Sequence, residues 1–269
     1  METQLTKEEI VTGHRPLVSL DKAATGNVVN LLQALKELKS LFDSAKINYW
    51  LNMGTLLGAV RSNEFIDGDG DIDLGVVVDE MPKILPLLSE LGKKGWRVDV
   101  TTFSLFLLRL ESNVLIEVII YQRQEDKLWT PLLKIPPRFN SFLKYTDLIA
   151  ERAIYRSYHQ NIPRRHALAY ALIPSWLDRP IRKLLFSIND LCGQKHYAMS
   201  FPVELLNNLQ VVKLYDQEFL SPSPAETYLT LIYGPTWRVP NPNWKTENTV
   251  AINKGLFKTS DQANYVLIK

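Results

Sequence analysis

The chain has 269 residues, of which 46% are hydrophobic and 22% charged, and its formal net charge is +2. This composition excludes a wholly disordered chain, and the small net charge gives no electrostatic reason to expect a nucleic-acid partner. The single cysteine, Cys192, excludes an intramolecular disulfide and a cysteine-rich zinc site.

The sequence predicts a cytoplasmic protein. Its first residues contain no apolar segment of the kind found in secretory signal peptides, and no window approaches the ~18 uninterrupted apolar residues of a membrane span. The scarcity of cysteine fits a reducing compartment. We therefore expect the protein in the cytoplasm, or at the inner face of the membrane through peripheral contact.

Hydrophobic periodicity predicts alternating helices and strands after a loose N-terminal arm at 1–26. The expected elements are a helix at 28–44, a strand at 49–51, a short helix at 56–61, a strand at 72–78, a helix at 80–92 capped by Asp79, and strands at 96–101, 104–110 and 114–121. The last two strands are expected to form a hairpin. This order predicts an α+β core with a mixed sheet over residues 27–125.

The second half of the chain, 126–269, is expected to be a helical region that packs on the core. Residues 130–140 are rich in proline and are expected to lack regular structure. The expected elements are helices near 146–160, 178–190 and 224–233, and a weak strand at 265–268. Ser223, Pro224 and Glu226 have the spacing of a capping box at the start of the last helix.

Four aspartates lie within residues 67–73, and two of them enter a predicted strand. Because alternate strand residues share a face, Asp71 and Asp73 are expected to project together, with Ile72 directed into the core. A pair of carboxylates suits a hard divalent ion, Mg²⁺ or Mn²⁺, that also binds phosphate oxygens. The alternatives are a solvated acidic turn and a calcium-binding loop, and the second lacks the closing glutamate.

Gly54 and Thr55 lie where a predicted strand gives way to a helix. Glycine allows a phosphate to approach the backbone, and the threonine hydroxyl and the amides at the helix start can donate hydrogen bonds to it. A purely structural tight turn is an equally good explanation of this pair alone. Followed by Asp-x-Asp on the next strand, the pair has the layout of the polymerase-β-like nucleotidyltransferase fold.

Two stretches of the sequence resemble the LicD/fukutin-type phosphotransferases. The first reads GTLLGAVR at 54–61, FI at 65–66 and DGDIDL at 69–74, and departs from the family's usual FIPWDDDIDI at Asp67, Gly68 and Gly70. The second is similar to a terminal "YL…YG…W…P" block of the family and consists of Tyr228, Leu229, Tyr233, Gly234, Trp237 and Pro240. The two stretches occur in the family's order.

The resemblance implies a nucleotidyltransferase-like core and a phosphotransferase activity. Such enzymes move phosphocholine, ribitol phosphate or a similar group from a CDP-activated donor to a hydroxyl of a glycan. The implied partners are therefore a CDP-activated donor and a glycan or lipid-linked glycan acceptor, with Mg²⁺ or Mn²⁺ as cofactor and no nucleic acid. Residues 125–220 contribute little to the resemblance.

A third carboxylate is expected on a neighbouring strand, because this fold usually has one there. Glu117 is a lone charge in an apolar run, so it is predicted either to complete the metal shell or to accept the proton of the attacking hydroxyl. A solvent-facing strand position is the alternative, and Asp99 is the rival carboxylate. The family pattern usually has aspartate at the position of Glu117.

Other residues complete the predicted site. Arg61 is expected to hold the donor's diphosphate through a forked contact, and Asp69 is placed at the rim of the site. Tyr233, Gly234 and Trp237 fit a pocket lining, although helix capping and core packing explain them at least as well. The segment 173–186 mixes apolar and basic residues and fits either an internal amphipathic helix or a membrane-surface helix.

Three functional hypotheses follow. The first is the metal-dependent phosphotransferase, with Asp71, Asp73 and Glu117 as catalytic and metal-binding residues. The second is a nucleotidyltransferase that acts on a small phosphate compound or another acceptor. The third is an inactive nucleotide-binding protein, which is disfavoured because both aspartates of the pair are present. Walker-type NTPase and protein-kinase motifs are absent from the sequence.

Overall fold

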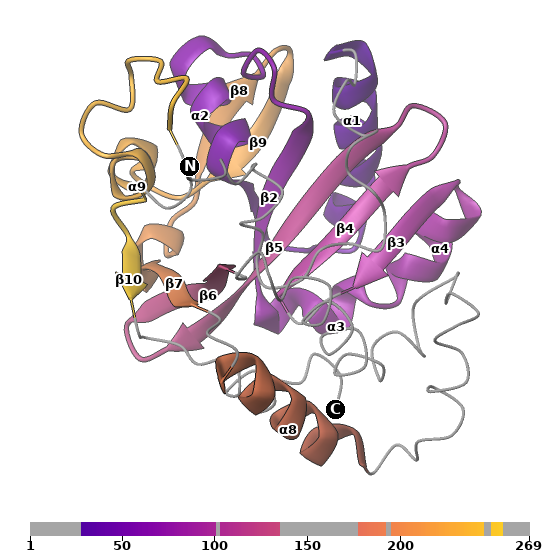
Figure 1. Ribbon diagram of the computed structural model, residues 1–269. Helices are drawn as coiled ribbons and strands as arrows, with labels where there is room; N and C mark the ends of the chain where they lie inside the picture. The colour runs from indigo at the N-terminus through magenta and orange to yellow at the C-terminus, as the bar shows by residue number, and fades with distance from the viewer. Residues whose placement is uncertain (1–27, 101–102, 135–176, 192–194, 245–248, 255–269) are drawn as a thin grey trace, which may run out of the picture.

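The computed structural model describes residues 28–100, 103–134, 177–191, 195–244 and 249–254 (Figure 1). The expected arm at 1–26, the helix near 146–160 and the strand at 265–268 lie outside these residues. The helices are α1 Val28–Ser44, α2 Met53–Ser62, α3 Met81–Ile84, α4 Leu87–Lys93, α8 Asp178–Leu191 and α9 Ala225–Tyr233. The strands are β1 Tyr49–Leu51, β2 Asp71–Val77, β3 Trp96–Val100, β4 Ser104–Arg109, β5 Val114–Gln124, β6 Lys127–Lys134, β7 Lys195–Pro202, β8 Gln210–Leu214, β9 Gln217–Ser221 and β10 Ile252–Lys254.

One mixed sheet organises the described chain. Its strands follow the order β1-β2-β5-β6-β7-β10, and β4 and β3 extend it from another part of β5. The pair β2–β5 is parallel, whereas the other pairs of this sheet are antiparallel. The predicted α+β class with a mixed sheet is therefore confirmed.

Part of the hydrophobic core is formed by α1 and the sheet. The helix buries Leu31, Leu35, Leu38 and Phe42, which recur at helical spacing as the sequence predicts. The alternate β2 residues Ile72, Leu74 and Val76 are also fully buried. Since alternate residues of a strand point in opposite directions, Asp71 and Asp73 belong to the other face of β2.

The prediction of one continuous helix at 80–92 is wrong. The structure instead has a 3₁₀ turn at Val78–Glu80, then α3 and α4, because Pro86 cannot continue the hydrogen-bond ladder of a helix interior. Asp79 does not cap this helix. It lies in the 3₁₀ turn and forms an ion pair with Arg123 at 2.9 Å.

The second half is more β-rich than the sequence analysis expected. Besides α8 and α9 it contributes β6, β7 and β10 to the core sheet, and β8 and β9 form a separate hairpin. Strand β6 passes through Pro131, within the segment expected to be irregular. Proline is tolerated there because β6 pairs with β5 only at residues 127–129, so at Pro131 only the β7 side carries a pairing.

The start of α9 differs from the predicted capping box. Pro224 is the N-cap residue and no side-chain cap forms. The side-chain oxygen of Gln210 instead accepts the Ala225 N–H at 3.2 Å, and Glu226 pairs with Arg238. The cap is therefore supplied by the β8–β9 hairpin, which is distant in sequence.

Among the described residues, no helix combines the length and apolar character needed to cross a bilayer.

Candidate functional site

The turn from β1 into α2 brings the first predicted motif against β2. The helix begins at Met53, earlier than expected, so Gly54 and Thr55 lie in its first turn. Met53 has a positive φ of 41°, which is uncommon for a residue other than glycine and marks a sharp change of direction. The backbone N–H groups of this turn are among those that have no partner inside the helix.

Two hydrogen bonds join this turn to Asp73. The Gly54 N–H donates to Asp73 Oδ2 at 3.3 Å, and the Asp73 N–H donates to Thr55 Oγ1 at 2.8 Å. A carboxylate at the positive end of a helix is electrostatically favoured. Thr55 is buried, and its hydroxyl oxygen ties α2 to β2, so this predicted phosphate ligand also has a structural task.

Asp69 lies against the same glycine. A Cβ atom built on Gly54 would come within 2.3 Å of Asp69 Oδ2 and 3.7 Å of Asp73 Oδ2. Glycine at position 54 is therefore what allows the Asp69 carboxylate to approach the first turn of α2, whereas Asp73 would tolerate a Cβ atom there. The structure brings four predicted site residues together here: Gly54, Thr55, Asp69 and Asp73.

Glu117 stands beside Asp73 through the register of the sheet. Residues 73 and 117 are direct partners in the parallel β2–β5 pair, about 4.8 Å apart across the strands. Both are half-buried, and Ser104 Oγ donates to Glu117 Oε1 at 2.7 Å. Asp71 lies two residues before Asp73 on the same strand and is also half-buried. The parallel register thus places all three predicted carboxylates at one region of the sheet.

The rival carboxylate is remote from this region. Asp99 pairs with Phe106 on β4, and Phe106 pairs with Glu117. The backbone of Asp99 is therefore three strand spacings, about 14 Å, from β2. This register favours Glu117 over Asp99.

Within the described ranges, no group of three or more His, Cys, Asp or Glu side chains is arranged as a ready-made metal-binding cluster.

A buried polar triad behind the site escaped the sequence analysis. Tyr228 OH donates to Asn52 Oδ1, Asn52 Nδ2 donates to Tyr121 OH at 3.0 Å, and the two tyrosine oxygens lie 3.5 Å apart. All three side chains are fully buried, and burial raises the pKa of both tyrosines, which are therefore neutral. Tyr228 of the second family-like block thus contacts the residue that precedes α2. The signal in the sequence that pointed to Tyr228 was its place in that block.

Loss of one hydroxyl from this triad should destabilise the fold. Tyr228→Phe removes a donor to Asn52 Oδ1 in a fully buried place, so we expect the free energy of unfolding to fall by about 1–3 kcal/mol. Urea denaturation measures the change. Thr227→Ala on the same helix removes an exposed hydroxyl and is expected to change the stability by less. Equal stabilities of the two variants would contradict the role of the triad.

Arg61 lies in the last turn of α2 and Tyr233 is the last residue of α9, and these two helices pack against each other (Figure 1). Burial raises the pKa of Tyr233 well above its ordinary value, the negative charges of Asp73 and Asp69 raise it further, and the positive charge of Arg61 opposes them. Tyr233 also contacts Trp244, with ring centroids 4.6 Å apart. Trp244 is a second residue that the sequence analysis missed, since it lies outside both family-like stretches. Trp237 is buried in the core.

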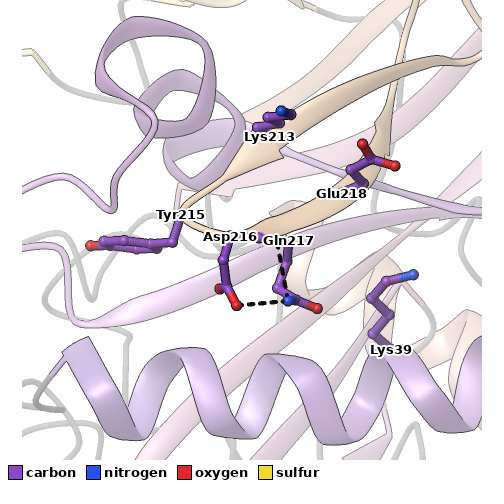
Figure 2. Close-up of a pocket in the computed structure, with 6 residues that line it drawn as sticks. All are labelled: Lys39, Lys213, Tyr215, Asp216, Gln217 and Glu218. Carbon is purple, nitrogen blue, oxygen red and sulfur yellow. Dashed lines mark hydrogen bonds between the residues drawn. The ribbon is translucent and has the colours of Figure 1, made fainter.

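A groove of about 450 Å³ lies elsewhere, between α1 and the β8–β9 hairpin. Figure 2 shows its lining, which is Lys39, Lys213, Tyr215, Asp216, Gln217 and Glu218. None of the predicted site residues lines it. Two lysines and two acidic residues share the groove, so it has no dominant charge.

Comparison with known proteins finds similarity over part of the chain. Residues 46–109 match the family model described as LicD/FKTN/FKRP, nucleotidyltransferase domain. An uncharacterized protein of Rickettsia prowazekii (strain Madrid E) is 30% identical over 106 residues, which are 36% of this chain and 40% of that protein. An uncharacterized protein of Rickettsia typhi (strain ATCC VR-144 / Wilmington) is 27% identical over 99 residues, 37% of this chain and 31% of that protein. The chain thus spans less than half the length of these relatives.

Two solved structures show only remote similarity. The structure of ANT(2")-Ia in complex with adenylyl-2"-tobramycin has 13% identity and a TM-score of 0.29, and the match covers 58% of this chain and 97% of that chain. The structure of the STING-associated CdnE c-di-GMP synthase from Capnocytophaga granulosa has 10% identity and a TM-score of 0.25, with coverages of 62% and 67%.

Proposed function

We propose that the protein is a metal-dependent phosphotransferase, because residues 46–109 match the LicD/FKTN/FKRP nucleotidyltransferase-domain family model. In this proposal it moves a phospho-alcohol group, such as phosphocholine or ribitol phosphate, from a CDP-activated donor to a glycan hydroxyl. The observation that carries the proposal is the placement of Asp73 between the first turn of α2 and Glu117. The family match by itself supports the coarser statement, a transferase of the phosphate-transfer kind.

The chemistry of the carboxylates at this place supports a divalent cation in the proposal. Asp71 and Asp73 offer hard oxygen ligands from one face of β2, and Mg²⁺ is commonly held by one or two carboxylates together with substrate phosphates. In the proposal these two aspartates hold Mg²⁺ or Mn²⁺, with Glu117 as a third ligand or as the base. The bound cation would neutralise charge on the transferred phosphoryl group.

The protein's own groups would position the reactants. The first turn of α2 presents backbone N–H groups at a helix N-terminus, where a phosphate binds favourably. Arg61 in the last turn of the same helix would hold the diphosphate, and Asp69 would contact the acceptor at the rim. If Glu117 acts as the base, it would take the proton of the attacking hydroxyl, and Ser104 would orient its carboxylate.

The second candidate is nucleotidyl transfer, which the description of the matched domain favours. The products separate the two reactions. Incubation with a panel of CDP-activated donors, an acceptor glycan and Mg²⁺ should release CMP if the proposal is right. Formation of a nucleotide–acceptor bond instead would establish the second candidate. Undiminished formation of either product in excess chelator would contradict metal dependence.

Peripheral contact with a membrane that carries a lipid-linked acceptor is also part of the proposal, at the cytoplasmic face. The residues that support it lie on α8, where Leu184 and Leu191 are 61% and 87% exposed. They are seven positions apart, so they share one side of the helix. Lys183 beside them is also exposed, and a cation next to apolar side chains suits an anionic lipid surface.

A minimal change at Gly54 should separate function from stability. In Gly54→Ala the new methyl would meet the end of the Asp69 side chain, which is half-buried and can rotate away. We expect turnover to fall about tenfold to a hundredfold because Asp69 and the bound phosphate are displaced. The melting temperature should stay nearly unchanged, since alanine is well tolerated in a helix. Turnover and nucleotide affinity measure the effect, and an affinity equal to that of the wild type would count against phosphate binding here.

A further inference from the structure

Asn52 occupies the N-cap position of α2, yet its side chain does not cap the helix. Its backbone is extended, with φ −125° and ψ 165°, and its carbonyl oxygen accepts the Leu56 N–H at 3.0 Å as the first hydrogen bond of the helix. An asparagine at an N-cap ordinarily accepts the N–H of the second or third helical residue with its side-chain oxygen. In α2 those residues are Gly54 and Thr55, and no such bond forms.

Two tyrosines hold the Asn52 amide away from the helix. Tyr228 on α9 donates to Asn52 Oδ1, which is the atom that a cap would use. Asn52 Nδ2 donates to Tyr121 OH on β5 at 3.0 Å, so both ends of the amide are bound by tyrosines. The three side chains are fully buried, and a buried polar atom leaves its partner only at the cost of an unsatisfied group. The direction of the Asn52 side chain is therefore set by residues distant in sequence.

Asp73 takes the hydrogen bond that the Asn52 side chain leaves open. The Gly54 N–H is the second of the helix, and it donates to Asp73 Oδ2 at 3.3 Å. The Asn52 N–H donates to Asp73 O at 3.0 Å, which fixes the two residues relative to each other. A backbone N–H that binds a carboxylate orients it, and partners that orient a metal ligand affect metal affinity and activity. If Asn52 Oδ1 turned toward the helix, it would compete with Asp73 for the Gly54 N–H.

We propose that Tyr121 and Tyr228 are positioning residues, which restrain Asn52 so that the Gly54 N–H orients the Asp73 carboxylate. Loss of the Tyr228 hydroxyl releases Asn52 Oδ1, which then caps α2 and displaces Asp73 from Gly54. Neither tyrosine is a catalytic residue, since each acts through Asn52. The inference deepens the proposed function and rests on it for the role of Asp73 as a metal ligand.

Mn²⁺ binding to the full chain without nucleotide tests the restraint. Tyr228→Phe should weaken the Mn²⁺ affinity about tenfold, as loss of a partner that orients a metal ligand does. Addition of Asn52→Ala to this variant should restore most of the affinity, because alanine has no oxygen that can cap the helix and keeps both backbone bonds of residue 52. Thr227→Ala, which removes an exposed hydroxyl from α9, is the matched control and should bind as the wild type does. Circular dichroism confirms that each variant is folded.

The rescue by Asn52→Ala separates positioning from a purely structural role. Both substitutions remove buried hydrogen bonds, so a structural role predicts that the double variant binds Mn²⁺ no better than Tyr228→Phe. That result, or equal affinity of Tyr228→Phe and the wild type, would overturn the inference. Tyr121→Phe, which loosens the amide at its other end, should show a smaller loss and the same rescue, and it serves as the test if Tyr228→Phe does not fold.

A crystal structure of metal-free Tyr228→Phe gives a second, direct result. We expect Asn52 Oδ1 within hydrogen-bond distance of the Gly54 N and the Asp73 carboxylate turned away from it. An Asn52 side chain that still points toward Tyr121, with Asp73 bound to Gly54 as before, would overturn the inference. If the wild type binds no Mn²⁺, metal dependence in the proposed function fails, and this crystal structure still decides whether the tyrosines restrain Asn52.

Discussion

Asp73→Asn is expected to reduce turnover by several orders of magnitude while leaving the melting temperature unchanged or higher. Asp73 is a predicted metal ligand whose carboxylate accepts a hydrogen bond from the Gly54 N–H and whose strand neighbour is Glu117. Asparagine lacks the negative charge that a hard divalent cation requires. Without that charge the phosphoryl group would be neither oriented nor neutralised.

The fold should survive this change for two reasons. The asparagine side chain retains an oxygen that can accept the Gly54 N–H, and the backbone pairing of β2 with β1 and β5 does not involve the side chain. The substitution also removes one charge from a region that contains Asp69, Asp71 and Glu117, which lowers their mutual repulsion in the metal-free protein. Activity and stability are therefore expected to change in different directions.

CMP release and thermal unfolding measure the two effects. Asp67→Asn is the matched control, because it makes the same chemical change at an exposed position of the same acidic loop. It should retain most of the activity. Full activity of Asp73→Asn, or turnover undiminished by excess chelator, would refute the assignment of Asp73 as a metal ligand.

A clear loss of stability is expected from Gly58→Ala. A Cβ atom at this position would come within 2.3 Å of the Glu64 carbonyl oxygen and 3.2 Å of the Ile66 N. These are backbone atoms of the loop that leads from α2 to the acidic segment. Relief of the clash therefore requires the loop to move as a whole, and overpacking of this kind costs about 1–3 kcal/mol, occasionally more.

The β8–β9 hairpin prevents the loop from moving away easily. The Tyr215 N–H donates to Asn63 O at 2.9 Å, and the Phe65 N–H donates to Tyr215 OH at 3.2 Å. The rings of Phe65 and Tyr215 also pack at 5.6 Å between centroids. The loop is thus held from the outer side while the new methyl group would push from the helix side. This loss should exceed the gain of about 1 kcal/mol from replacing a helical glycine.

Chemical denaturation compares Gly58→Ala with Gly54→Ala. Both make the same substitution in one helix, but the methyl at position 54 meets the end of a side chain and the methyl at 58 meets backbone. Only Gly58→Ala should lower the free energy of unfolding clearly. An increase in the stability of Gly58→Ala would show that helix propensity outweighs the clash and would contradict this explanation of the glycine.

Much of the local structure and part of the site followed from the sequence. The helix at 28–44, the strands around residues 50, 74, 98, 107 and 118, and the shared face of Asp71 and Asp73 all appear where the periodicity predicts them. The family resemblance is confirmed for residues 46–109. These features depend on side chains within a few positions of one another, so a linear pattern contains the information that determines them.

Only the tertiary structure decided which distant residues meet. The parallel β2–β5 register put Glu117 beside Asp73 and left Asp99 three strands away, and the packing of α9 on α2 brought Tyr228 to Asn52. Strand β6 continues through Pro131 because its pairing there is on the β7 side alone. Such outcomes depend on strand order, register and helix packing between segments far apart in the chain, and no local periodicity encodes them.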